Sequence, residues 1–256
     1  MSSNRSHSYR YGRLLSLAIV ALLTGCDSGD AAKSTTAKPT NEPTSSETAR
    51  DITGIPGFAP LETGTYYIDP DNDPSTPLRV VYEISADGWS QWGGAVKFVE
   101  GSGDGHVGVS ITTVTDLVSH GCRDHSPADP PVGPTVNDLA AGLADLAPFR
   151  VTSPPTDITM YGYGGKHLEL TVPDLPVERS GDGLSFSECD GGNLNSWIAP
   201  YLDKFYGHTG PGYTEEFWIL DVEGSRLVIV AHRSPGVPSE DIAELRAVLN
   251  SIRIEP

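Results

Sequence analysis

Residues 119–125 (SHGCRDH) place a thiol, two imidazoles and a carboxylate within a short stretch of the chain. His120 and His125 flank Cys122, and thiolate and imidazole groups are the usual ligands of zinc. The two histidines are five positions apart, which does not match the i, i+4 pair of a helical zinc site, and nearby prolines argue against a helix. A polar loop around a disulfide is the simpler interpretation.

Cys122 and Cys189 form an even pair beyond the N-terminal segment. In an oxidising compartment such a pair favours a disulfide, and closing a loop of about 67 residues would contribute about 4 kcal/mol in the chain-entropy model. A redox-active pair is less favoured because C-x-x-C spacing is absent. A metal site formed by Cys122 with His120 and His125 remains the more specific alternative.

Asp69, Asp71 and Asp73 stand at alternate positions, as carboxylates do in calcium loops. An EF-hand-type loop also needs Gly at its sixth position and Glu at its twelfth, which are Pro74 and Val80 here. The specific pattern fails, so we expect an acidic turn, and calcium binding stays open. No metal or other cofactor is predicted.

Motifs for hydrolysis and phosphate binding are absent from the sequence. G-x-S-x-G, S-x-x-K and H-E-x-x-H do not occur. The glycine-rich residues 101–105 (GSGDG) lack the Lys and Ser/Thr of a phosphate loop, and they carry an Asp where phosphate would lie. We therefore predict no catalytic residue.

Aromatic residues cluster in segments expected to be loops, and six of them are candidates for a binding surface. Core packing is the alternative for each, although Trp and Tyr are enriched at binding sites. The six residues are Trp89, Trp92, Tyr161, Tyr163, Trp197 and Tyr206.

Residues 1–25 have a basic head, an apolar run at 14–23 and small residues before Cys26, as in a secretory signal peptide. The LTGC segment that ends at Cys26 resembles the lipobox of bacterial lipoproteins. That resemblance implies a lipidated Cys26 at the outer face of the cytoplasmic membrane. A spanning anchor is disfavoured because ten residues cover only about 15 Å as a helix. A cleaved signal without lipid is the other alternative.

Residues 26–54 are expected to form a lipidated cysteine and a disordered tether, and residues 55–256 a single extracytoplasmic domain. The stretch 27–50 has no aromatic residue and no Val, Ile or Leu, so it cannot bury enough apolar surface to fold. All 34 acidic residues but only 14 of 17 basic residues follow Cys26, which gives the mature chain a formal charge of −20. This charge disfavours nucleic acid as a partner.

Hydrophobic periodicity predicts strands and two helices in the domain. Strands are expected at 78–84, 107–114, 158–160 and 167–172, and a hairpin at 216–232 around Glu223-Gly224. Helices are expected at 135–146, where Thr135 and Asp138 imitate a capping box, and at 238–252. This mixture of antiparallel strands and helices indicates an α+β domain.

A strand followed by Ala86-Asp87-Gly88-Trp89 resembles the opening of PsbP/Mog1-like domains, with Ala86 in place of their usual Pro. The ending is also similar: a hairpin, an amphipathic helix and the segment 250–254 (NSIRI). LpqN-type actinobacterial lipoproteins share the lipobox, the tether and such a domain. The resemblance implies an antiparallel sheet flanked by helices, with long insertions at 115–134 and 173–213, and it carries over no catalytic residues.

These features predict a lipid-anchored cell-envelope module that binds a small molecule or an envelope protein and is not an enzyme. Two other classes stay open: an envelope enzyme with an unrecognised active site, and a structural or stress-related envelope protein.

Overall fold

The computed structural model describes residues 48–256 except 102, 104, 181–182 and 200–203. The chain divides into two units, Met1–Thr44 and Ser45–Pro256, and everything described here belongs to the second. The predicted signal peptide, Cys26 and the tether up to residue 47 lie outside the described residues.

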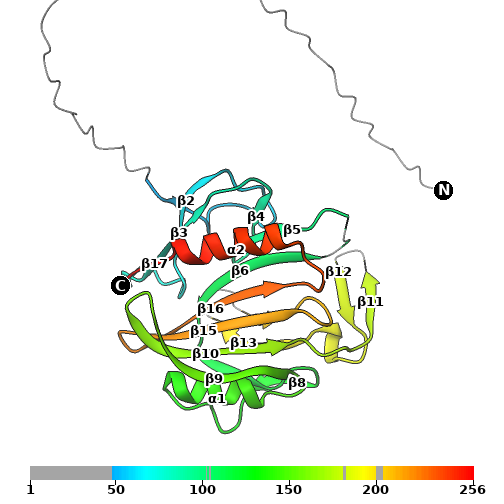
Figure 1. Cartoon of the computed structure of the whole chain (residues 1–256). Coiled ribbons are helices and arrows are strands. Elements are labelled where there is room, and N and C mark those ends of the chain that lie inside the picture. Colours follow the sequence, from blue (N-terminus) through cyan, green and yellow to red (C-terminus); the bar gives the residue numbers. More distant parts are fainter. Residues whose placement is uncertain (1–47, 102, 104, 181–182, 200–203) are drawn as a thin grey trace, which may run out of the picture. The chain divides into compact units, whose positions relative to one another are not determined.

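A seven-stranded sheet forms the centre of the domain (Figure 1), and every pair of neighbouring strands in it is antiparallel. The strand order is β4 (Trp89–Gln91), β5 (Gly94–Phe98), β6 (His106–Thr113), β16 (Ser225–Arg233), β15 (Thr214–Val222), β10 (Tyr163–Thr171) and β9 (Arg150–Met160). The predicted hairpin is confirmed as β15 and β16. Its turn residues Glu223 and Gly224 both have positive φ, 51° and 88°, as a type I′ turn requires.

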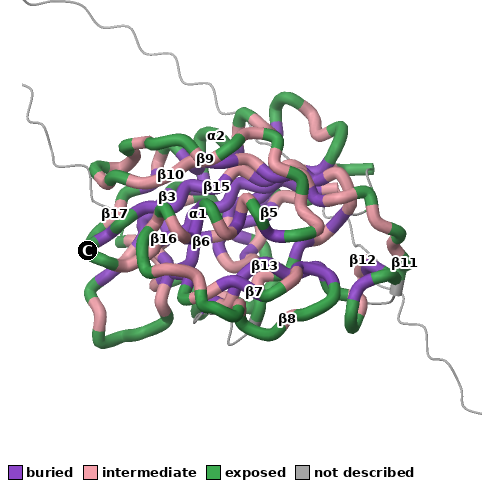
Figure 2. The backbone as a smooth tube through the Cα atoms, turned by 90° about the horizontal axis from the view of Figure 1, so that it is seen from below, coloured by how far each residue is buried: buried purple, intermediate pink, exposed green. Residues whose placement is uncertain are grey.

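Side chains of the inner strands alternate between two hydrophobic clusters, one on each face of this sheet. Trp218 and Ile229 belong to the first cluster, whereas their neighbours Phe217 and Val230 belong to the second. Figure 2 shows buried residues along β6, β15 and β16. These strands therefore form the centre of the core.

The first face packs against a smaller sheet and the C-terminal helix. The smaller sheet has the order β1 (Arg50–Asp51), β2 (Gly64–Ile68), β3 (Arg79–Ile84) and β17 (Arg253–Glu255). Helix α2 (Ser239–Ser251) contacts β3, β6 and β16 and buries Leu245, Val248 and Leu249. The helix predicted at 238–252 is thus confirmed.

The second face packs against helix α1 (Val136–Asp145) and another four-stranded sheet. Thr135 and Asp138 form the predicted capping box, and Leu139 and Leu143 are buried against the sheet. The additional sheet has the order β14 (Lys204–Gly207), β13 (Asn195–Ala199), β7 (Asp116–His120) and β8 (Asp124–Pro127). In Figure 1, α1 and α2 lie on opposite sides of the central strands.

A third, smaller cluster surrounds the disulfide. It contains Phe186, Leu194 and Tyr213 besides the two cysteines. Two elements precede β13 in this region. They are the hairpin of β11 (Val177–Ser180) and β12 (Gly183–Phe186), and the 3₁₀ turn η1 (Asp190–Gly192).

The predicted α+β class with a helix-flanked sheet is wrong. Of the described residues 48% are in strands and only 13% are helical, and the strands form several sheets. The error arises in segments 115–134 and 173–213. Apolar and polar residues do not alternate clearly there, so strands are not predicted, yet these segments form β7, β8 and β11 to β14. Strand β9 also extends through Pro154 and Pro155, which an edge strand tolerates because one side of its backbone needs no ladder bonds.

Candidate functional site

A cavity of about 300 Å³ lies against the central sheet, on the face that carries the second cluster. Its floor comes from β6, β15 and β16, and β14 and the β4–β5 turn form its walls. The lining residues are Trp92, Gly93, Ser110, Ile111, Thr112, Phe205, Tyr206, Gly207, Thr209, Glu215 and His232.

The strand register places the polar floor residues side by side. Glu215 on β15 pairs directly with His232 on β16, and His232 pairs with Gly108 on β6. Glu215 lies two positions from Phe217, and His232 lies two positions from Val230. Residues two apart in a strand share a face, so both side chains point to the second face. On β15 and β16, the apolar positions that face the second cluster are thus followed by the polar side chains of Glu215 and His232.

Glu215 is almost fully buried beside another buried side chain, His208. Nδ1 of His208 lies 2.7 Å from Oε2 of Glu215, and the two side chains are 0% and 2% exposed. The ring orientation does not give a directed hydrogen bond between them. Phe149 contacts the His208 ring at 4.4 Å between centroids, so this pair is enclosed by an apolar wall.

His232 is the most unusual group of the cavity. It is 6% exposed, and neither ring nitrogen has a hydrogen-bond partner within the part of the chain that the structure describes. Burial, followed by the nearby His106 and His208, lowers the pKa of His232 to about 3. The ring is therefore neutral at physiological pH and presents one N–H donor and one nitrogen acceptor.

His106 connects the cavity to aromatic side chains at the surface. Its Nδ1 lies 3.1 Å from the hydroxyl of Tyr213, and its backbone N–H donates to Ser234 Oγ. The ring contacts Trp92 at 5.3 Å and Phe98 at 5.6 Å between centroids. This histidine is held by its neighbours, in contrast to His232.

Tyr206 forms an aromatic wall that stays uncharged. Its ring stacks on Trp197 at a centroid distance of 4.3 Å and an interplanar angle of 16°. Burial, followed by the negative charge of Glu215, raises the pKa of Tyr206 well above its ordinary value of 10, although a hydrogen bond with Ser110 opposes this. The phenol therefore keeps its proton at physiological pH.

The structure brings together three of the six aromatic candidates. Trp92 and Tyr206 line the cavity, and Trp197 lies buried behind Tyr206.

The other three candidates lie elsewhere. Trp89 is buried in the first cluster, and its Nε1 donates to Glu244 on α2. Tyr161 donates to the carbonyl of Leu249, and Tyr163 packs on the same first cluster.

Sequence reasoning missed the polar residues of this site, which are His106, His208, Glu215 and His232. For two of them, the sequence pattern could have predicted an inward-facing polar side chain. Glu215 and His232 each continue the inward-facing register of an apolar strand, Phe217 and Ile219 in one case and Val228 and Val230 in the other.

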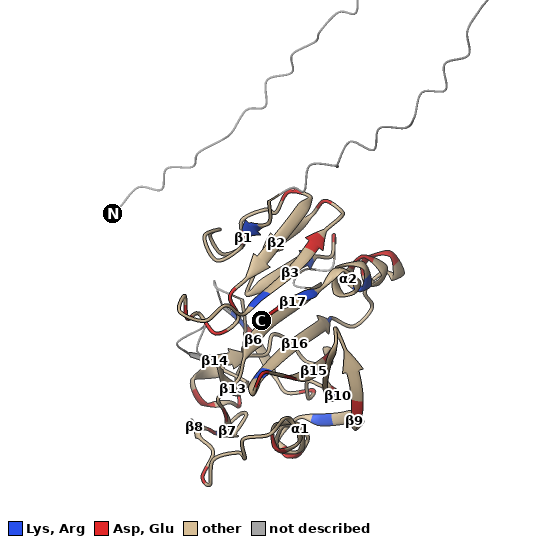
Figure 3. Ribbon diagram, turned by 90° about the vertical axis from the view of Figure 1, so that its left-hand side faces the viewer, with Lys and Arg blue, Asp and Glu red and all other residues tan. Residues whose placement is uncertain are grey.

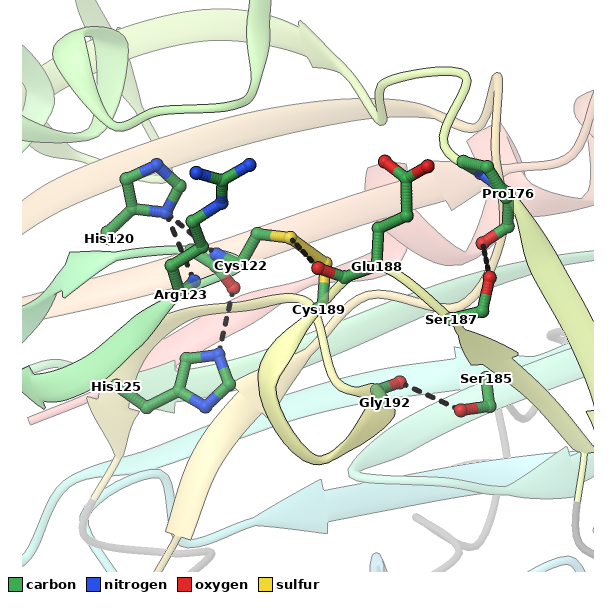
Figure 4. The surroundings of a disulfide bond; sticks show 11 residues. His120, Cys122, Arg123, His125, Pro176, Ser185, Ser187, Glu188, Cys189 and Gly192 are labelled. Atoms are coloured by element: carbon green, nitrogen blue, oxygen red, sulfur yellow. Dashed lines mark hydrogen bonds between the residues drawn. A yellow bond between two sulfur atoms is a disulfide. The ribbon is translucent and has the colours of Figure 1, made fainter.

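The predicted disulfide is confirmed between Cys122 and Cys189, and its surroundings contain the two candidate histidines (Figure 4). Nδ1 of His120 accepts hydrogen bonds from the backbone N–H groups of Cys122 and Arg123, at 3.1 and 3.2 Å. His125 Nε2 lies 3.1 Å from the carbonyl oxygen of Gly121. The sulfurs bond to one another and the imidazoles contact backbone groups, as expected of a polar loop around a disulfide.

The three aspartates of the candidate calcium loop have partners in their own turn or at the start of β3. Asp71 accepts from Thr76, Asp73 accepts from Ser75, and Asp69 lies 3.3 Å from the Arg79 guanidinium. Across the described residues, no group of three or more His, Cys, Asp or Glu side chains is arranged to hold a metal ion. In the same residues, no helix is both long and apolar enough to cross a membrane.

No family model matches this chain, and no match was found among the curated proteins.

Proposed function

We propose that this protein is a cell-envelope lipoprotein whose folded domain binds a small organic molecule in the cavity over β6, β15 and β16. The observation that carries this proposal is His232, whose two buried ring nitrogens have no partner in the described protein. Leaving a buried polar atom without a hydrogen bond costs about 1–3 kcal/mol. A ligand that pairs with these nitrogens would offset that cost.

The shape of the site favours a small molecule over a partner protein. The cavity is concave, combines aromatic walls at Trp92, Phe205 and Tyr206 with few polar groups, and its volume lies at the lower end for ligand pockets. The polar groups lie on β15 and β16 of the central sheet, so their positions are fixed by the ladder. Such a site supports selective binding without a large docking surface.

The chemistry of the polar groups favours binding over catalysis. A general base works best with a pKa near the operating pH, and the pKa of His232 is about 3. The Thr112 hydroxyl, a cavity oxygen, has two backbone carbonyls as acceptors for its single proton, those of Pro70 at 3.3 Å and Thr113 at 3.0 Å. His232 would therefore act through its fixed donor and acceptor.

The proposed location depends on Cys26 and on the segment that precedes it. Its support is the basic head, the short apolar run and the lipobox-like LTGC segment. Detergent phase partition tests it: the full chain should enter the detergent phase and the Cys26→Ala variant the aqueous phase. Equal partition of the two chains would refute lipid anchoring.

The binding proposal is tested on the full chain purified in detergent micelles. Native mass spectrometry after gentle release should reveal a co-purified small molecule, and a mixed library of small molecules should contain members that raise the midpoint of thermal unfolding. The same library on Ser110→Phe, which fills the cavity floor, should give no shift. Equal shifts in both chains, or no shift and no co-purified molecule in the wild type, would refute cavity binding.

A further inference from the structure

We infer that the ligand of this cavity is a small organic cation, a protonated amine attached to a flat apolar body. This inference rests on the proposed function and adds the chemical class of the ligand. It follows from the charge, the hydrogen-bonding groups and the aromatic faces of the site.

The composition of the cavity lining is acidic. Glu215 is the one carboxylate among the described lining residues, and no Lys or Arg occurs among them. A buried carboxylate needs a counter-charge or several hydrogen bonds, since desolvating it alone is costly. An anionic ligand would add a second negative charge, so a cation fits this site best.

The hydrogen-bonding groups match an ammonium. A carboxylate has about four acceptor positions on its two oxygens, so Glu215 can accept from an ammonium while His208 stays 2.7 Å from Oε2. Glu215 and His232 are direct partners across β15 and β16, so one ammonium can reach both side chains. The unprotonated nitrogen of the neutral His232 ring then accepts a second N–H of the same group.

Aromatic faces complete the site. Trp92, Phe205 and Tyr206 line the walls, and the faces of aromatic rings attract cations. They also provide apolar surface for a flat ligand body. The cavity volume of about 300 Å³ limits that body to roughly ten non-hydrogen atoms, if each takes about the share of one water molecule.

The wider electrostatic field acts in the same direction. The chain has a formal charge of −17, and acidic residues occur on α1, α2 and several loops (Figure 3). Such a field raises the local concentration of cations and repels anions. It would increase the rate at which an amine reaches the cavity.

The test compares four probes of similar size on the wild-type full chain in detergent micelles, by isothermal titration calorimetry. The probes are 2-phenylethylamine, its neutral isostere 2-phenylethanol, the anion phenylacetate and the quaternary phenyltrimethylammonium. We expect the amine to bind at least about tenfold more tightly than the alcohol, because a hydrogen bond to a charged group is worth that much. Phenylacetate should not bind, and the quaternary ion should bind less tightly than the amine because it has no N–H to donate.

Glu215→Gln, with Glu216→Gln as its matched control, assigns the preference to the site. Glu216 is the next residue of β15 and its side chain contacts Arg246 and His167 on the other face. In Glu215→Gln the preference for amine over alcohol should disappear, and in Glu216→Gln it should persist. A second measurement needs no variant: raising the pH above the amine's own pKa should weaken amine binding and leave alcohol binding unchanged.

The outcomes separate this inference from the proposed function. If alcohol and amine bind equally, or if Glu215→Gln keeps the amine preference, the cation assignment is wrong while cavity binding stands. If none of these probes binds but an unrelated library molecule does, the cation assignment is again wrong. If no molecule of any class binds, both proposals are wrong.

Discussion

Gly108 on β6 lies directly opposite His232 on β16, and the imidazole occupies the space that a side chain at position 108 would need. A Cβ atom on Gly108 would lie 2.3 Å from His232 Nε2 and 2.9 Å from the backbone oxygen of Ala95. Both distances are shorter than van der Waals contact. The glycine is therefore what allows a buried imidazole on the cavity floor.

Gly108→Ala should displace the His232 ring and weaken ligand binding. Overpacking of this kind typically costs about 1–3 kcal/mol, which urea denaturation would measure as a lower unfolding free energy. Gly164→Ala on β10 is the control, because its Cβ would meet nothing within 4 Å. Equal stability of the two variants would show that the His232 ring moves without cost.

His232→Phe should stabilise the domain and abolish ligand binding. The substitution removes two buried nitrogens that lack partners and keeps a ring of similar shape, so we expect a gain of about 1–3 kcal/mol. His106→Phe is the control, because it breaks the contact with the Tyr213 hydroxyl and should lower stability. Thermal unfolding of both variants decides this, and a loss in His232→Phe equal to that in His106→Phe would contradict it.

Acid should destabilise the domain through His232. The pKa of the folded ring is about 3, whereas an unfolded histidine titrates near pH 6.5. Between these values the unfolded chain binds a proton that the folded chain does not, so the unfolding free energy decreases as pH falls. For one group the slope is about 1.4 kcal/mol per pH unit.

A comparison of wild type and His232→Phe isolates this contribution, since other titrating groups are common to both chains. The stability advantage of the variant should increase by about 1 kcal/mol between pH 6 and pH 5 in urea denaturation. Parallel pH curves for the two chains would mean that His232 is protonated in the folded state or exposed.

The elements that the sequence predicted correctly are those fixed by local interactions. The capping box of Thr135 and Asp138 starts α1, and Glu223-Gly224 sets the turn between β15 and β16. Long-range pairing has no such signal. Leu227 pairs with Thr113, far away in the chain, and the partners of β13 are selected by packing of residues such as Trp197.

The binding site was only partly accessible to sequence reasoning. Trp92 and Tyr206 stood out as aromatic residues in expected loops, but the structure separates them from Trp89, which lies in the first cluster. Glu215 and His232 gain their meaning only when the register of β15 and β16 makes them neighbours. A single polar residue at an inward-facing strand position marks a site, but not the residues that complete it.

The Cys122–Cys189 disulfide should contribute substantially to stability, because it connects the β7–β8 turn to η1 over a separation of 67 residues. Closing a loop of this length is worth about 4 kcal/mol in the chain-entropy model, and loss of native disulfides typically costs about 2–5 kcal/mol. A reductant should therefore lower the urea midpoint of the wild type. The Cys122→Ser/Cys189→Ser double variant should start at the lower midpoint and not respond to reductant. A wild-type midpoint unchanged by full reduction, checked by titrating the released thiols, would show that the packing of Phe186, Leu194 and Tyr213 holds this region without the bond.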